Sequence, residues 1–138
     1  MIKAYTIGMI EKYDAFRKAK AAAKYVNGTF GEISNGVFTA GATKFQVLMQ
    51  VGKGDTLYTD FDVVANEDIR VADLSKWAGK QLQISPLHLP ATFAVGNKLV
   101  SDANGKLIVS ASPTTPFLLV DKVIDFDGVG ALVTIMLA

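Results

Sequence analysis

Short apolar runs separated by glycine-rich turns dominate the chain from residue 24 onward. Asn27-Gly28 and Asn35-Gly36 stand eight residues apart, in the near repeats NGTF and NGVF. Asn-Gly is the strongest short-range signal for a β-hairpin, because both residues tolerate positive φ. Seven or more short strands, about ten residues apart, predict a mainly β chain that folds as a small antiparallel β-sandwich or β-barrel-like domain.

The last third of the chain gives the clearest strand pattern. Residues 98–100 and 106–109 flank the turn Asp102-Ala103-Asn104-Gly105, and residues 117–124 and 131–137 are two further apolar runs. Residues 81–84 alternate between polar and apolar side chains, as a half-buried strand does. Residues 45–51 form an apolar run typical of a buried strand.

Residues 11–25 are the one candidate helix. Alanine and lysine have good helix propensity, and the segment's apolar residues approximate an i, i+3, i+4 stripe. The flanking segments resemble strands and no strong cap is present, so an extended arm is the alternative. We therefore expect a basic arm or short helix over residues 1–25 and a single β-rich domain over residues 26–138.

Charge is divided unevenly along the chain, although the formal net charge is only +1. Residues 1–25 carry six basic and two acidic side chains, whereas residues 55–75 carry six acidic side chains and only Arg70 as a base. Two alternatives follow: the basic arm of one copy docks on the acidic face of another, or the two segments are separate solvated surfaces. The near-neutral balance argues against a dedicated nucleic-acid-binding protein.

Several kinds of chemistry are excluded by composition. The 138 residues include no cysteine, so thiol catalysis, disulfides and cysteine-bound metals are excluded. The single histidine, His88, has no second histidine for a metal cluster and is expected to make loop contacts. Asp60 and Asp62 would share one face of a strand, which favours an acidic surface over a calcium site. We expect no enzyme activity and no cofactor.

The N-terminal residues lack the pattern of a targeting segment. Apolar residues there are interrupted by Lys3, Tyr5, Thr6 and Gly8, so no signal peptide is expected. No stretch approaches the ~18 uninterrupted apolar residues of a membrane helix, and no membrane partner is expected.

The order of motifs in the C-terminal third resembles a family. The segments FAVGNKLVSD (93–102), NGKL (104–107), PFLLV (116–120) and GALVTIML (130–137) are similar to those of the small β-rich capsid decoration, or cement, proteins of tailed bacteriophages. The opening KAYTIGMIEKYDA (3–15) resembles the same family. Two departures are Asn97, where the family usually has aspartate, and residues 77–90, which match no family feature.

This resemblance implies a non-enzymatic virion structural protein. It would bind the major capsid protein on the capsid exterior as a homo-oligomer, after assembly in the host cytoplasm, and stabilise the shell. Residues 1–20 would be the arm that adds as a strand to a neighbour. The expected capsid or subunit contacts are Lys3, Tyr5, Tyr13, Phe16, Arg17 and Trp77.

Two alternatives remain beside this function. A tail-tube or head-to-tail connector subunit would use the same kind of β domain. A small-ligand or carbohydrate-binding β module, from a different functional class, is motivated by Trp77, Tyr58 and the nearby acidic residues.

Overall fold

The structure, a computed structural model, describes residues 2–4, 15–41, 46–49, 62–111, 117–125 and 128–136. These residues form thirteen strands and two short 3-10 helices, η2 (Leu74–Trp77) and η3 (Pro86–His88). The strands are β1 (Ile2–Ala4), β2 (Phe16–Ala21), β3 (Tyr25–Val26), β4 (Phe30–Ser34), β5 (Val37–Ala40), β6 (Gln46–Leu48), β7 (Asp62–Val63), β8 (Asp68–Asp73), β9 (Gln81–Ile84), β10 (Lys98–Ser101), β11 (Leu107–Val109), β12 (Phe117–Asp125) and β13 (Gly128–Ile135). The predicted mainly β fold is confirmed.

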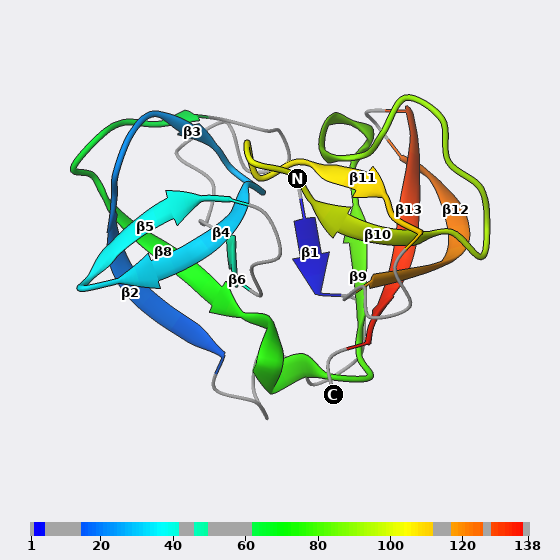
Figure 1. The fold of residues 1–138 in the computed structure, drawn as a ribbon, viewed down its shortest axis with the longest axis horizontal. Helices are drawn as coiled ribbons and strands as arrows, with labels where there is room; N and C mark the ends of the chain where they lie inside the picture. Colours follow the sequence, from blue (N-terminus) through cyan, green and yellow to red (C-terminus); the bar gives the residue numbers. More distant parts are fainter. Residues whose placement is uncertain are drawn as a thin grey trace.

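Two sheets organise the molecule (Figure 1). A closed five-stranded barrel has the order β2-β5-β4-β6-β8, and a six-stranded sheet has the order β1-β9-β13-β12-β10-β11. A further pair, β3 and β7, is antiparallel. Only β2 and β5, which complete the barrel, pair in parallel among the described strands. The predicted hairpins in the last third are confirmed as β10–β11 and β12–β13.

The barrel strands face two different cores because side chains alternate along a strand. Leu48 and Val71 point into a cluster made by the barrel strands and β7, together with Phe38 and Ile69. Their chain neighbours, Val47 on β6 and Ala72 on β8, belong to the other cluster. Strands β6 and β8 therefore contribute to both cores.

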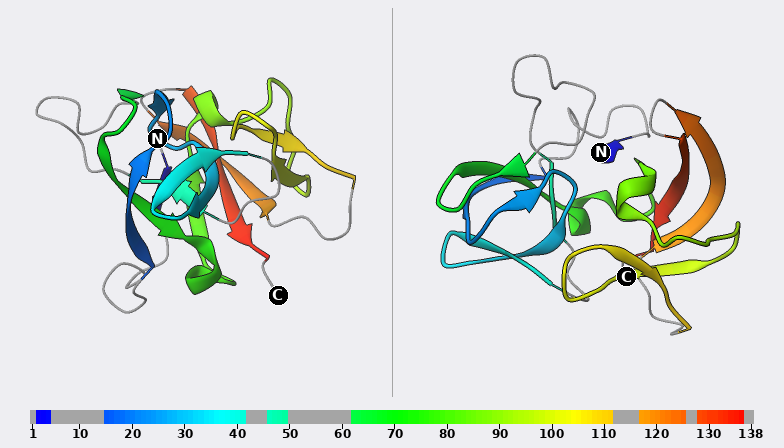
Figure 2. Two further views of the ribbon diagram at one scale, coloured as in Figure 1. Left: turned by 60° about the vertical axis from the view of Figure 1, so that its left-hand side comes forward. Right: turned by 90° about the horizontal axis from the view of Figure 1, so that it is seen from above.

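The second cluster joins the barrel to the six-stranded sheet. Phe30 on β4 and Phe117 on β12 pack with ring centroids 5.2 Å apart. The Phe30 N–H donates to the Gly105 carbonyl at 2.9 Å, and the Ser101 hydroxyl donates to the Gly41 carbonyl at 2.9 Å. The right-hand view in Figure 2 shows the barrel and the sheet side by side. Apolar packing and main-chain hydrogen bonds thus bind the two units into one body.

Residues 1–25 do not form a separate arm where the structure describes them. Strand β1 is the edge strand of the six-stranded sheet, with Ile2 opposite Ile84 and buried. Strand β2 lies in the barrel, between β5 and β8. The predicted helix over residues 11–25 is wrong for Phe16–Ala21, because strand partners from distant sequence override the local helix propensity of alanine and lysine.

The two Asn-Gly pairs make different turns. Asn35 and Gly36 both have positive φ, 52° and 76°, as in the type I′ turn that joins a tight hairpin, here β4–β5. At the other pair only Gly28 is positive, with φ of 102°, and the Thr29 N–H donates to the Val26 carbonyl at 3.2 Å. This turn does not pair its flanking strands: β3 pairs with β7, and β4 pairs with β5 and β6. The hairpin prediction is confirmed at the second pair only.

Candidate functional site

The basic and acidic segments of the sequence meet inside one chain. Strand β2 runs antiparallel to β8, and the Lys20 ammonium lies 2.7 Å from the Asp68 carboxylate. Arg17 lies 3.8 Å from Asp73, next to the same pair of strands. These pairs are solvent-accessible, and exposed ion pairs of this kind contribute little to stability. The sequence predicted either docking of the two segments between copies or two separate surfaces. These contacts lie within one chain and fit neither alternative.

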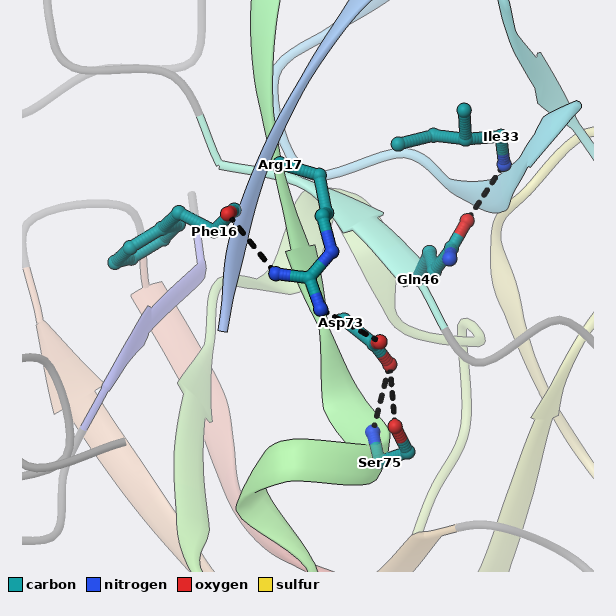
Figure 3. A network of polar contacts seen from close by, with 6 residues as sticks. All are labelled: Phe16, Arg17, Ile33, Gln46, Asp73 and Ser75. Carbon is teal, nitrogen blue, oxygen red and sulfur yellow. Dashed lines mark hydrogen bonds and ion pairs between the residues drawn. The ribbon is translucent and has the colours of Figure 1, made fainter. Parts of the chain in front are cut away.

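Hydrogen bonds fix the lower end of this strand pair (Figure 3). Arg17 donates from Nη1 to the Phe16 carbonyl at 3.3 Å, while its Nη2 faces Asp73. Asp73 accepts from the N–H and the hydroxyl of Ser75 at 3.1 and 2.6 Å, which caps η2. The hydrogen bond from Lys20, followed by the charge of that ammonium, lowers the pKa of Asp68 below its usual value.

An open groove of about 850 Å³ lies beside β2. Its lining consists of residues 16–20 of β2, residues 35–37 at the tip of the β4–β5 hairpin, and residues 68–70 of β8. The groove exists because β5 reaches β2 only at Lys20 and Ala21. In the described part of the chain, residues 16–19 therefore have β8 on one side and no strand on the other.

An aromatic and cationic stack forms one end of this groove. The Arg70 guanidinium carbon lies 4.0 Å from the Phe16 ring centroid, and the Phe16 and Trp77 rings meet edge to face at 5.6 Å. Arg70 also donates from Nε to the Met49 carbonyl at 2.8 Å. Burial lowers the pKa of Arg70, but a guanidinium stays charged at neutral pH. The stack holds one positive charge in a fixed position at the groove.

The structure brings together three of the six predicted contact residues. Phe16 and Arg17 line the groove, and Trp77 packs against Phe16. Trp77 is fully buried, so its ring is core in this chain and offers no outer contact surface. Lys3 lies in β1 opposite Gln83, in the six-stranded sheet and not in the barrel sheet. Tyr5 and Tyr13 lie outside the described residues.

Sequence reasoning missed the remaining cations of the groove as site residues. Lys18 and Arg70 are directly opposite in the β2–β8 register, next to Lys20 and Asp68. The signal was the alternation of Arg17-Lys18-Ala19-Lys20-Ala21, in which small residues separate the lysines. That alternation is typical of a strand with one buried face, but the segment was interpreted as a helix.

A second candidate surface lies on the six-stranded sheet, at its edge strand β11 and at the end of the hairpin formed by the inner strands β12 and β13. Strand β11, at one end of the sheet, exposes Ile108 and Val109 at 41% and 45%. At the end of the β12–β13 hairpin, Ile124 and Val129 are cross-strand partners with exposures of 83% and 46%. Uncovered apolar edge strands are common sites of association with another chain.

His88 is buried inside the molecule. It was expected to make loop contacts, and it contacts a turn. Its ring packs against the Asn27-Gly28 turn, and a Cβ placed on Gly28 would collide with the ring. Burial lowers the pKa of His88 to about 3, helped by the nearby charge of Lys106 and opposed by a hydrogen bond with the Asn27 backbone. The neutral imidazole thus links η3 to the barrel.

Within the residues that the structure describes, no group of three or more metal-ligating side chains comes together. Asp62 pairs with Lys24 at 3.2 Å, and Asp60 lies outside the description. No helix in the described ranges is both long and apolar enough to cross a bilayer.

Comparison of the chain with protein-family models, with curated proteins and with solved structures found no match.

Proposed function

We propose that this chain is a non-enzymatic virion structural protein that binds the shell of a tailed bacteriophage on its exterior and stabilises it. The observation that carries the proposal is the apolar strand β11, which is an edge strand among the described residues and exposes Ile108 and Val109. The partner is the major capsid protein, and the working form is a homo-oligomer.

Strand addition is the physical route for this binding. Among the described strands β11 pairs only with β10, so its other edge can offer main-chain hydrogen bonds to an extended segment of the shell. Burial of the neighbouring apolar side chains would add about 25 cal/mol per Å² removed from water. In this mechanism the edge strand β11, and not the N-terminal arm, pairs with a strand of the shell.

The resemblance to decoration proteins supports the same surface. The segments 93–102 and 104–107 contain β10 and the start of β11, while 116–120 and 130–137 contain parts of β12 and β13. Four neighbouring strands of one sheet therefore carry the C-terminal similarity. Segment 93–102 includes Leu99 and Val100, the strand partners of Val109 and Ile108.

Two Val→Lys variants test this proposal, one on the edge strand β11 and one beside β7. Val109→Lys places a charge on the β11 edge, and Val64→Lys makes the same change at an exposed position beside β7. We expect V109K to weaken co-sedimentation with empty capsid shells by tenfold or more. V64K should stay within twofold of the parent chain.

Other outcomes would contradict the proposal. Failure of the parent chain to bind shells would overturn the capsid function, and a folded V109K variant with full binding would overturn the role of β11. Rings or tubes of the purified protein in electron micrographs, without shell binding, would favour a tail-tube or connector subunit. The carbohydrate-binding alternative loses its main support because Trp77 is fully buried.

A further inference from the structure

We propose that the groove beside β2 binds an extended, acidic segment of a partner protein, which adds as one strand to the open edge of β2. This inference is independent of the capsid proposal, because it concerns the barrel and not the six-stranded sheet.

The main chain of β2 provides the first argument. Lys20 and Ala22 each donate an N–H toward the β5 side, to the Gly36 and Phe38 carbonyls, both at 2.9 Å. The alternate residue Ala21 points the other way and donates to the Glu67 carbonyl at 3.0 Å. Because backbone groups alternate along a strand, the N–H and C=O of Lys18 face the β5 side as well.

No strand of the described chain meets Lys18 on that side, since β5 pairs only with Lys20 and Ala21. The groove lies at this position. One main-chain donor and one acceptor are thus available next to a paired stretch of the same strand. An incoming strand would continue the ladder that β5 begins.

Charge determines the kind of segment. Among the described residues, Arg17, Lys18, Lys20 and Arg70 line the groove against the single carboxylate of Asp68. Lys18 and Lys20 lie two residues apart on the same face of β2, and no ion pair holds Lys18 within the described ranges. Directly opposed side chains on paired strands have Cβ atoms ~5 Å apart. Lys20 already lies opposite Val37 of β5, so a glutamate or aspartate opposite Lys18 would meet the Lys18 ammonium, with the charge of Lys20 two residues away on the same face.

The groove suits a polypeptide better than a nucleic acid. Sequence-tolerant binding of single strands depends on aromatic rings on which bases stack. Here the Arg70 guanidinium already covers one face of the Phe16 ring. The Trp77 ring also packs against Phe16, in an edge-to-face arrangement. The unpaired strand edge, by contrast, recognises only a main chain.

Fluorescence anisotropy with short labelled peptides tests the proposal. The probes are acetyl-EVEVEV-amide, its basic counterpart acetyl-KVKVKV-amide, and acetyl-EPEPEP-amide, which keeps the charge but has proline at alternate positions and so lacks those N–H groups. We expect EVEVEV to bind at least tenfold more tightly than either of the others. Equal binding of EVEVEV and EPEPEP, or tighter binding of a labelled oligo-dT, would overturn strand addition.

Two lysine substitutions locate the site. Lys18→Glu reverses a charge in the groove, and Lys76→Glu makes the same change on η2, where the side chain is also exposed. K18E should weaken EVEVEV binding tenfold or more, and K76E should stay within twofold. Equal affinity in K18E and the parent chain would refute the site.

A second measurement does not depend on any variant. Addition of EVEVEV should slow hydrogen exchange of the Lys18 amide in the parent chain, and an unchanged rate would refute the proposal. Failure here would leave shell binding by β11 unaffected, so the two proposals are separable.

Discussion

His88 is a histidine kept neutral by its surroundings. It is almost fully buried, and its pKa is lowered to about 3, chiefly by burial. The unfolded chain has a histidine pKa near 6.5, so it takes up a proton before the folded chain does. The resulting stabilisation is fully present above pH 6.5 and is lost as the pH falls from 6.5 toward 3.

We predict that the free energy of unfolding falls by about 2 kcal/mol between pH 7.5 and pH 5 through His88 alone. His88→Gln should remove this part of the pH dependence, because glutamine does not titrate. Urea unfolding of both proteins across this range measures the difference. Carboxylates such as Asp68 contribute equally to both, so parallel pH profiles would show that His88 is not the group responsible.

Only part of the groove could be predicted at the residue scale. Phe16 and Arg17 were among the capsid or subunit contacts expected in the N-terminal segment. The importance of Lys20 depends on Asp68, its partner 48 residues later in the chain. That register is decided by the pairing of β2 with β8, which no local pattern reveals.

Elements were predictable where partners are close in sequence. The β10–β11 and β12–β13 hairpins join neighbouring strands, so apolar runs and turn residues were sufficient to predict them. Strand β2 was mistaken for a helix because its partners β5 and β8 lie far along the chain. Alanine and lysine favour a helix locally, but the paired strands bury Ala19 and Ala21 against the barrel core.

The two Asn-Gly turns make a matched test at the element scale. Alanine at Gly28 or Gly36 would adopt positive φ, which costs about 1–2 kcal/mol. Gly28→Ala should cost about 1–3 kcal/mol more, because its Cβ meets the buried His88 ring, whereas the space at Gly36 is open. Urea unfolding of both variants measures this difference. Equal losses of stability would mean that the His88 contact yields without cost.

At the scale of the whole molecule, the barrel and the sheet should unfold together. The shared cluster contains Trp77, the single tryptophan, which is fully buried. Phe38 belongs to the other cluster, inside the barrel. Because β6 and β8 contribute side chains to both clusters, destabilising one should destabilise the other.

We predict that Phe38→Leu lowers the free energy of unfolding by about 1–2 kcal/mol. Trp77 fluorescence and far-ultraviolet circular dichroism should give coincident urea midpoints, both shifted by the same amount. A shift seen only by circular dichroism would mean that the barrel unfolds independently of the sheet.

The position of β1 has a consequence for synthesis. Ile2 pairs with Ile84, and β9 in turn pairs with β13 near the end of the chain. A two-stranded pair is marginally stable in water, so β1 and β9 alone would not persist. On the ribosome, β1 emerges before its sheet partners and therefore becomes stably ordered only after residues 131–134 have been made. Contacts over such separations are characteristic of proteins that fold in milliseconds to seconds.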